Sequence, residues 1–486
     1  MAASESDLGQ AAARGGVWAV AGEVSSRVAQ SVVFFVLAGI LTPAQFGAAA
    51  VAFICVQVLN SLTYAGLGSA VQVLGPDRDR DRTAVGLALV VGGLGTGLLA
   101  VLAGPLCELL RAPEATNLVR LVGLALPLAQ TSEVLSALLA RDLRFRATGS
   151  CVVVASLLSA AVGLGLAAAG FGASALVAQG VVQPGIRLVG LVLVRPAAFQ
   201  PRLHRTSLRE IWAVGRDLLI GNTFDTAAGN VDNVAVSAIA GAAALGAYGF
   251  GYNLTAIPLF VLGVAASRVA LPIYARLLRE GHQLVTAFAS AVEATAWLSA
   301  LPLGFLALAG PRALEVVFGT TWAPVYDALR VLAVHGWLRT VETASTTALV
   351  ALGHAATTRR VQQWQLLLAA LLLPGLVAAQ GVLGGAVAVL LAVAAGTAYS
   401  LRQSTRRTGT ALSLVLRRMA ESAVGGVASG MAGLAVLATR GDGLGLALAL
   451  ACAVAAWAVV LRLLRPTTVR TACGLLRPPP LPGDRV

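Results

Sequence analysis

The chain has 486 residues, of which 57% are hydrophobic and 12% charged, and its mean hydropathy is +0.82. A soluble globular domain carries about 25% charged residues, so this composition excludes a water-soluble enzyme, a disordered regulator and a secreted disulfide scaffold. A transmembrane helix needs about 20 apolar residues. The sequence therefore predicts an all-α, polytopic membrane protein.

About fourteen apolar runs are long enough to cross a bilayer. The polar N-terminus lacks the basic region and cleavage site of a signal peptide, so we expect the first run to remain as a span. In chain order the runs are 17–41, 46–70, 83–107, 117–140, 147–168, 172–194, 211–238, 245–271, 284–309, 323–351, 361–380, 382–401, 418–439 and 443–464.

The arginines predict how these spans are oriented. All 35 basic residues are arginine, and the formal net charge is +13. With the N-terminus in the cytoplasm, only Arg111, Arg312 and Arg440 fall in connections on the opposite side. Because cytoplasmic loops are enriched in arginine and lysine, we expect a multi-pass protein of the plasma (inner) membrane with cytoplasmic N- and C-termini. The basic balance then reflects orientation and attraction to membrane lipids, and nucleic acid is not a predicted partner.

An internal repeat suggests the domain organisation. Trp18-Ala19-Val20 opens the first span and Trp212-Ala213-Val214 the seventh, and the segment beginning Phe46-Gly47 pairs loosely with that beginning Leu245-Gly246. Two parallel halves around a central cavity are a transporter architecture. The predicted fold is two pseudo-symmetric six-helix bundles and an added C-terminal helix pair. Its parts are residues 1–200, 201–402, 403–466 for the pair, and 467–486 for a disordered cytoplasmic tail.

Polar and charged residues inside the spans share helix faces. The sets are Glu23, Arg27 and Gln30; Gln179, Gln183 and Arg187; Asn222, Asp225 and Asp232; and, outside such stripes, Glu133, Glu293 and the pair Arg339/Glu342. Such residues are expensive in a membrane and face a partner or a cavity. One interpretation is that they form ion pairs that lock helices together, for which Arg339 and Glu342 have suitable spacing. The other is that they line a polar, partly hydrated cavity between the halves.

The cavity interpretation assigns roles to these residues. Arginine stays charged and binds oxyanions with two parallel hydrogen bonds, so Arg27, Arg187 and Arg339 are predicted to bind phosphate or diphosphate. Carboxylates in the same cavity would carry a coupling proton or sodium ion. The predicted ion-coupling and polar cavity residues are Glu23, Asp225, Asp232, Glu293, Glu342, Asn222 and Gln183.

The sequence predicts no enzyme, cofactor or metal site. It contains no phosphate-binding loop of the Walker type, and its cysteines and histidines follow no metal-ligand spacing. Gly93 and Gly97 form a GxxxG pattern, which inside a span predicts close packing of two helices.

Short motifs around the predicted spans resemble those of a known family. They are LTPAQFG at 41–47, GLGSAVQ at 66–72, NVDN at 230–233, AAALGAY at 242–248 and RVALP at 268–272. This set resembles bacterial polysaccharide-repeat-unit flippases of the multidrug/oligosaccharidyl-lipid/polysaccharide exporter superfamily. The resemblance covers roughly residues 15–360.

The resemblance implies two six-helix bundles in a V, alternating access and a cationic central cavity into which Arg27, Arg187 and Arg339 would fit. It implies translocation of an undecaprenyl-diphosphate-linked oligosaccharide to the outer leaflet for exopolysaccharide, capsule or another surface polymer. The expected partners are this lipid-linked oligosaccharide, membrane lipids, a coupling proton or sodium ion, and glycosyltransferases or polymerases. Alternatives that stay open are a lipid II flippase, a cation-coupled drug exporter, and a membrane scaffold for a glycan-synthesis complex.

Overall fold

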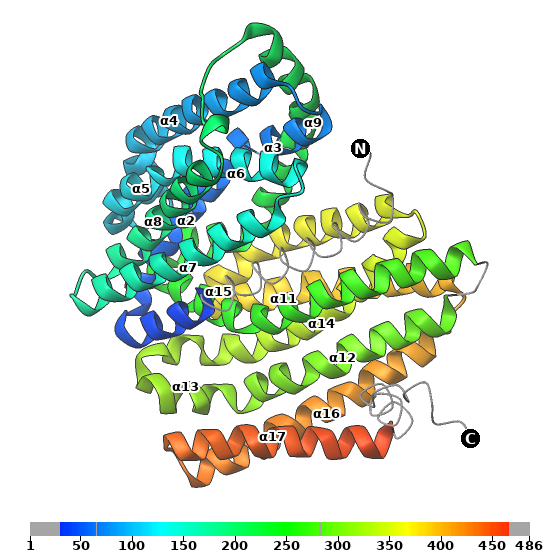
Figure 1. Ribbon diagram of the computed structural model, residues 1–486. Coiled ribbons are helices and arrows are strands. Elements are labelled where there is room, and N and C mark those ends of the chain that lie inside the picture. Colours follow the sequence, from blue (N-terminus) through cyan, green and yellow to red (C-terminus); the bar gives the residue numbers. More distant parts are fainter. Residues whose placement is uncertain (1–29, 65, 281–283, 466–486) are drawn as a thin grey trace, which may run out of the picture. The chain divides into compact units, whose positions relative to one another are not determined.

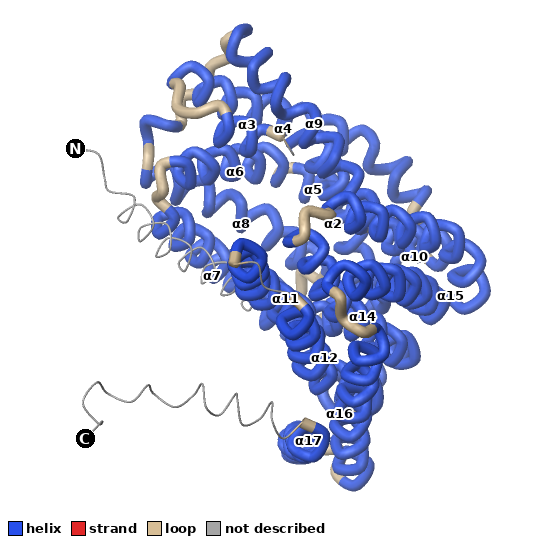
Figure 2. The backbone as a smooth tube through the Cα atoms, turned by 90° about the vertical axis from the view of Figure 1, so that its right-hand side faces the viewer, coloured by secondary structure: helices blue, strands red, loops and turns tan. Residues whose placement is uncertain are grey.

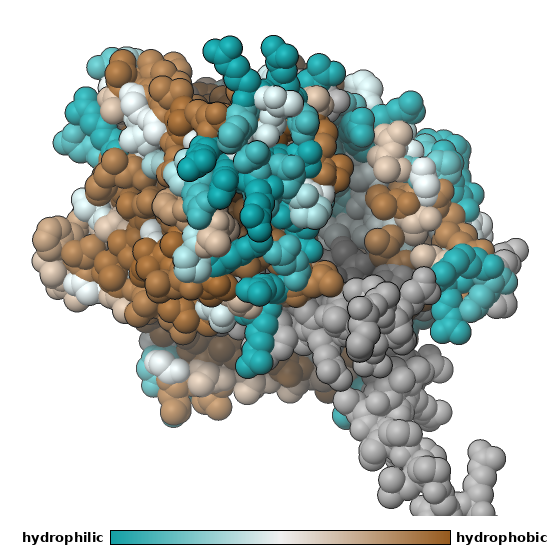
Figure 3. Space-filling model, turned by 45° about the horizontal axis from the view of Figure 1, so that its top comes forward, coloured by the Kyte–Doolittle hydropathy of each residue, from teal (hydrophilic) through white to brown (hydrophobic). Residues whose placement is uncertain are grey.

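The computed structural model describes residues 30–64, 66–280 and 284–465, and within these ranges it contains helices and connections but no strand (Figure 1, Figure 2). In this part of the chain, nine helices are long and apolar enough to cross a membrane. On the face that Figure 3 displays, hydrophobic side chains cover broad continuous areas, as expected of a surface in contact with lipid. The predicted class, a polytopic all-α membrane protein, is confirmed.

The chain forms two compact units. Unit 1 ends at Gly249 and includes Val377–Val382, and unit 2 contains the other described residues from Phe250 onward. The division between the units falls inside one long helix, whereas the sequence places a domain boundary at residue 200. The predicted four-part organisation stays a prediction, and its tail, 467–486, lies outside the described residues, as does Trp18 of the proposed repeat.

Unit 1 is built from helices of very different length. After a short apolar helix, Gln30–Ile40, they are α2 (Pro43–Tyr64), α3 (Leu67–Val73), α4 (Arg78–Leu109), η1 (Pro113–Ala115), α5 (Thr116–Gly123), α6 (Ala125–Arg141), α7 (Phe145–Ala168), α8 (Ala173–Val194), η2 (Pro196–Ala198), α9 (Arg205–Gly229), α10 (Val231–Ala240) and the start of α11 (Ala242–Arg279). Helix α8 packs against α6 and α7, and α9 against α2, α3 and α4.

Unit 2 contains the remaining helices. They are the rest of α11, then α12 (Val285–Leu308), α13 (Gly310–Phe318), η3 (Gly319–Val325), α14 (Tyr326–Ala351), α15 (Ala355–Thr408), α16 (Leu412–Thr439) and α17 (Gly443–Leu464). Helix α12 packs against both α14 and α16, and α16 packs against α17 (Figure 1).

Hydropathy locates most helix limits closely. The predicted runs 172–194 and 443–464 match α8 and α17 to within a residue. The predicted division at 380–382 is confirmed, because α15 is interrupted at Gly381, whose φ of 56° and ψ of −126° suit glycine and few other residues. The single predicted run 211–238 is wrong in one respect: it is two helices, α9 and α10, that meet at Asn230.

Ion pairs join the arginine-bearing connections at one end of unit 1. The pairs are Arg141–Asp81 (2.7 Å), Arg195–Asp142 (2.5 Å) and Arg80–Glu210 (2.7 Å). Arg111 follows the far end of α4, a helix of 32 residues, and its guanidinium donates to the Ile239 carbonyl at 2.8 Å. This arrangement agrees with the predicted alternation of connections between two ends, while the side of the membrane that each end faces stays a prediction.

Glycines let helix backbones touch in both units. In unit 1 the two segments of the proposed repeat cross each other: a Cβ on Gly47 would lie 1.7 Å from the Ala242 carbonyl oxygen, and one on Gly246 would lie 1.9 Å from that of Pro43. In unit 2 a Cβ on Gly304 of α12 would lie 2.2 Å from the carbonyl oxygen of Gly426 in α16. Only residues without a side chain permit such approaches.

The predicted packing role of Gly93 and Gly97 is wrong. A Cβ added to either glycine would meet nothing within 4 Å, whereas one on Gly92 would lie 2.5 Å from the Pro127 backbone. Helix α4 therefore turns a neighbouring face toward α6, because successive residues of a helix point about 100° apart.

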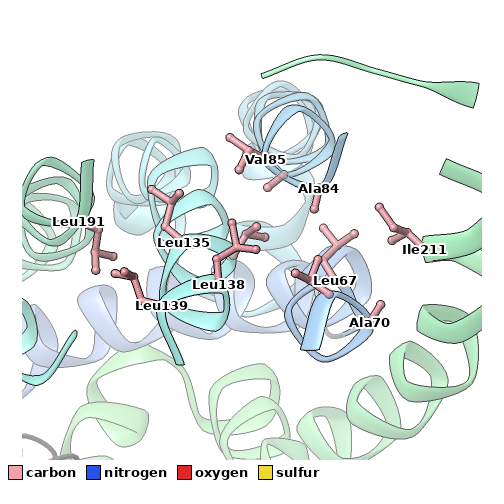
Figure 4. Packing of buried hydrophobic residues seen from close by; sticks show 12 residues of the cluster. Leu67, Ala70, Ala84, Val85, Leu135, Leu138, Leu139, Leu191 and Ile211 are labelled. Carbon is pink, nitrogen blue, oxygen red and sulfur yellow. The ribbon is translucent and has the colours of Figure 1, made fainter. Parts of the chain in front are cut away.

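The core of unit 1 lies where five helices meet. It includes Leu67 of α3, Val85 of α4, Leu138 of α6, Leu191 of α8 and Ile211 of α9, all nearly inaccessible (Figure 4). This cluster fixes α9 against the preceding helices.

The contact between α12 and α16 yields a stability prediction. We expect Gly304→Ala to destabilise the protein by about 2 kcal/mol, because the new methyl group overlaps the Gly426 backbone and the helices must separate. Gly375→Ala in α15 is the control, since a Cβ there meets nothing within 4 Å. Thermal unfolding of the purified protein in detergent measures both, and equal midpoints for the two variants would contradict the close contact.

Candidate functional site

Arg187 lies in α8 and is held by residues of α6. Its guanidinium forms an ion pair with Glu133 and donates a hydrogen bond to the Ser136 hydroxyl at 2.9 Å. One turn earlier on α8, the Gln183 amide donates to the Ser156 hydroxyl of α7 at 3.2 Å. The predicted polar face of this helix therefore contacts both neighbouring helices, and hydroxyl groups of serine are partners that hydropathy does not reveal.

The charges of Arg187 and Glu133 neutralise each other only while the two side chains stay together. The Glu133 side chain is 43% exposed, whereas that of Arg187 is 20% exposed. An anion that approaches from the exposed side could take the place of the carboxylate on the guanidinium, because both present oxygen acceptors.

Arg339 belongs to a network centred on Glu342. Its guanidinium donates to Glu342 and to the Gln365 side-chain oxygen, each at 3.0 Å. The other Glu342 oxygen accepts hydrogen bonds from the Gln365 amide at 2.6 Å and the Thr397 hydroxyl at 3.3 Å. The Glu342 side chain is 4% exposed and that of Arg339 is 35% exposed. The pair predicted from spacing is present, and α15 supplies two further members that sequence reasoning missed.

Asp232 follows the break between α9 and α10 and is buried. Its carboxylate accepts a hydrogen bond from the Tyr248 hydroxyl of α11 at 2.6 Å and one from the backbone N–H of Asn233 at 2.9 Å. Within the described part of unit 1, no arginine is bonded to this carboxylate. Interrupted helices hold coupling ions in many transporters, and acidic residues inside a membrane mark ion pathways and proton relays.

Glu293 of α12 lies in a different environment from the other predicted coupling residues. Its two oxygens pair with Arg418 of α16 at 2.8 Å and with Arg465, at the end of α17, at 3.2 Å. Arg465 also pairs with Glu421 of α16 at 2.6 Å. This cluster joins the two last helices to α12, so its geometry is that of a structural clamp, and a coupling role for Glu293 stays a prediction.

Four of the predicted site residues cannot be placed. Glu23 and Arg27 lie outside the described residues, and the side chains of Asn222 and Asp225 on α9 are likewise outside them. Arg187, Gln183 and Asp232 lie in unit 1, and Arg339, Glu342 and Glu293 lie in unit 2. Each of the two described arginines is brought together with a glutamate of its own unit.

The sequence of the chain matches a family model and known proteins. Residues 36–327 match the family model described as polysaccharide biosynthesis protein. The succinoglycan biosynthesis transport protein ExoT of Rhizobium meliloti (strain 1021) is 31% identical over 326 residues, which cover 65% of this chain and 64% of that protein. The matched segment thus spans slightly less than two thirds of this relative.

The fold is shared with solved structures of a lipid flippase and a multidrug transporter. The lipid II flippase MurJ in an inward closed conformation superposes with a TM-score of 0.73 over 93% of this chain and 100% of that one, at 9% identity. A multidrug resistance MATE family transporter of the MOP superfamily, in an inward-facing conformation, has a TM-score of 0.61 over 80% of this chain and 96% of that one, at 15% identity. At such identities the likeness establishes the fold alone.

The Glu293 cluster yields a prediction that separates a clamp from a coupling site. We expect Glu293→Gln to lower the free energy of unfolding by roughly 3 kcal/mol, because it removes the counter-charge of Arg418 in a largely buried position and leaves Arg465 paired with Glu421 alone. Glu315→Gln, which removes an exposed partner of Arg312, is the control.

Thermal unfolding in detergent measures this loss, and the double variant Glu293→Gln/Arg418→Met should recover part of it because it removes the unpaired cation. An unchanged midpoint for Glu293→Gln would show that the cluster does not hold the last helices in place.

Proposed function

Because the chain belongs to the polysaccharide biosynthesis protein family, we propose that it is a flippase for an undecaprenyl-diphosphate-linked oligosaccharide. It moves this lipid from the inner to the outer leaflet of the plasma membrane by alternating access, for synthesis of an exopolysaccharide, capsule or other surface polymer. Family membership carries this proposal, and the transporter fold and the arginines held among the helices support it. Transport, with no covalent chemistry, is the whole of the proposed activity.

The arginines would bind the diphosphate by exchange of partners. Arg187 forms an ion pair with Glu133, and Arg339 forms one with Glu342. A diphosphate offers several acceptor oxygens to the planar guanidinium and competes with the carboxylate for the same donors. The glutamate thus keeps the cation neutralised when substrate is absent, and the substrate brings its own negative charge. Arg27 completes the proposed binding set.

Coupling is assigned to carboxylates on the interrupted seventh span. Asp232 is buried beside the helix break and bonded to a neutral hydroxyl, so a proton or sodium ion can neutralise it without displacing an arginine. Asp225 and Asn222 lie on the preceding helix. The rest of the proposed polar set is Glu23, Glu293, Glu342 and Gln183. The proposed orientation has both termini in the cytoplasm, where glycosyltransferases would supply the substrate, with polymerases as further partners.

The lipid II flippase is the second candidate, because one protein of this fold, MurJ, is itself a lipid II flippase. A drug exporter or a scaffold has less support, because neither function needs arginines that exchange partners. These functions differ in the molecule that is moved, so one assay distinguishes them.

Reconstitution tests the proposed function and its arginines together. Purified protein in liposomes should make an undecaprenyl-diphosphate-linked oligosaccharide in the inner leaflet accessible to a membrane-impermeant pyrophosphatase that hydrolyses the diphosphate bridge. We expect Arg187→Ala and Arg339→Ala to slow this exposure by about tenfold or more, because each loses a charge-assisted hydrogen bond worth roughly 1.5–3 kcal/mol.

Arg312→Ala is the matched control, since that arginine is exposed and paired only at the surface. Exposure of lipid II but not of the oligosaccharide lipid would replace the proposed substrate, and no exposure of either would remove the flippase proposal. Full rates for both variants would remove these arginines from the binding set.

The coupling proposal predicts a change in gradient dependence. In Asp232→Asn the Tyr248 hydroxyl retains an oxygen acceptor while the ionisable charge is lost. We expect transport by this variant to become independent of an imposed proton or sodium gradient, measured in the same liposomes with each gradient applied in turn. Asp327→Asn, at an exposed position paired with Arg330, is the control. A wild-type gradient response in Asp232→Asn would exclude that carboxylate as the coupling group.

A further inference from the structure

Unit 1 contains an apolar groove of about 460 Å³ that is lined by none of the candidate site residues described above. It lies among α2, α3, α4 and α9, and its walls are formed by Leu62, Leu87, Val91, Leu208 and Leu219. Two of these leucines are substantially open to the surroundings, Leu62 with 47% and Leu208 with 37% of its surface exposed. The groove therefore opens outward at these two side chains.

Glycines create the floor of the groove. A Cβ on Gly66 would lie 2.2 Å from the carbonyl oxygen of Gly215 in α9, so the two backbones touch and neither contributes a side chain. Leu67 and Ile211, which also line the groove, belong to the buried core of unit 1 (Figure 4). The groove is thus a fixed depression whose shape depends on packed backbone.

The rim of the groove carries a cation and an amphipathic aromatic ring. Arg209 and Trp212 of α9 line it, one turn apart, and Trp212 is 60% exposed. The adjacent Glu210 is taken by Arg80, and Arg209 itself forms no ion pair or hydrogen bond with the described part of the chain.

This rim lies at the arginine-rich end of unit 1, where the ion pairs described above involve the start of α9. Tryptophan is enriched at the level of lipid headgroups, and an unneutralised arginine attracts an anion there. An apolar groove with one such cation at its mouth matches an amphiphile with a hydrocarbon tail and a single negative charge.

We propose that this groove binds an anionic phospholipid, with an acyl chain along the leucines, the phosphodiester on Arg209 and the Trp212 ring at headgroup level. The cation at the mouth balances the one negative charge of a phosphodiester, whereas the diphosphate of a lipid-linked sugar would leave one of its two charges unbalanced there. The bound lipid packs against both α9 and α2–α4 and so stabilises the position of α9, the helix that ends at the break before Asp232. This site is independent of the proposed transport function.

Native mass spectrometry and thermal unfolding of the full-length protein in detergent test the proposal. Phosphatidylglycerol and phosphatidylcholine with identical acyl chains are titrated separately. We expect phosphatidylglycerol to remain bound and to raise the unfolding midpoint at lower concentration than phosphatidylcholine, since a ligand of the folded state stabilises it by mass action. Arg209→Gln should weaken the binding of phosphatidylglycerol about tenfold and leave that of phosphatidylcholine unchanged.

Two further variants define the site. Arg205→Gln removes an exposed cation one turn earlier on the same helix that does not line the groove, and it should bind phosphatidylglycerol like the wild type. Leu62→Trp fills the groove from its exposed side, and it should abolish the adducts of both lipids while the unfolding midpoint without lipid stays close to that of the wild type.

Three results would overturn the proposal. Equal binding of the two lipids by the wild type would remove the role of charge. Equal losses in Arg209→Gln and Arg205→Gln would show that the lipid is attracted by the basic surface in general. Displacement of phosphatidylglycerol by an equimolar amount of undecaprenyl diphosphate would assign the groove to the carrier lipid.

Discussion

A charge inside a membrane needs a partner, and this requirement governs how the helices of the protein are held together. Hydrocarbon offers no water to solvate an ion, so an arginine or glutamate between helices is stable only beside an opposite charge or hydrogen-bonding groups. The ion pair of Arg187 with Glu133 joins α8 to α6. Glu342 of α14 bonds to Arg339 of the same helix and to Gln365 of α15. The same interactions that hold the helices in place give the protein donors that a phosphate can use.

A second class of contact needs no polar group. Because lipid chains are as apolar as leucine, helices in a membrane gain little from burying large apolar side chains against each other. Close contact between helix backbones provides the stabilisation instead, as where Gly304 of α12 meets Gly426 of α16, or where Gly47 meets the start of α11. In unit 1 these contacts bring together the two segments that resemble each other in sequence.

Hydropathy predicts the limits of helices well because those limits are set by bilayer thickness. It predicts α8 and α17 to within a residue, and the motifs around the spans identified the family correctly. The hydrogen-bond partners of a buried charge are harder to predict. Gln365 and Thr397, which donate to Glu342, lie 23 and 55 residues farther along the chain. It is equally hard to predict which face of a helix makes a contact. The contact of α4 falls on Gly92, one residue from the predicted Gly93, because a single step along a helix rotates its surface by about 100°. The break at Asn230 is not predicted, because the length of the run 211–238 fits one span and outweighs the Gly229-Asn230 signal for a helix end.

The interruption at Gly381 bears on how the protein is made. The two halves of α15 are joined with no loop, so little polar backbone has to cross the bilayer when this segment is inserted. A hairpin of this kind enters a membrane most readily as one unit, because each half then shields the other's polar side chains during passage. Insertion as one unit requires that both halves have emerged from the ribosome, and a chain truncated between them would present a single half to the insertion machinery.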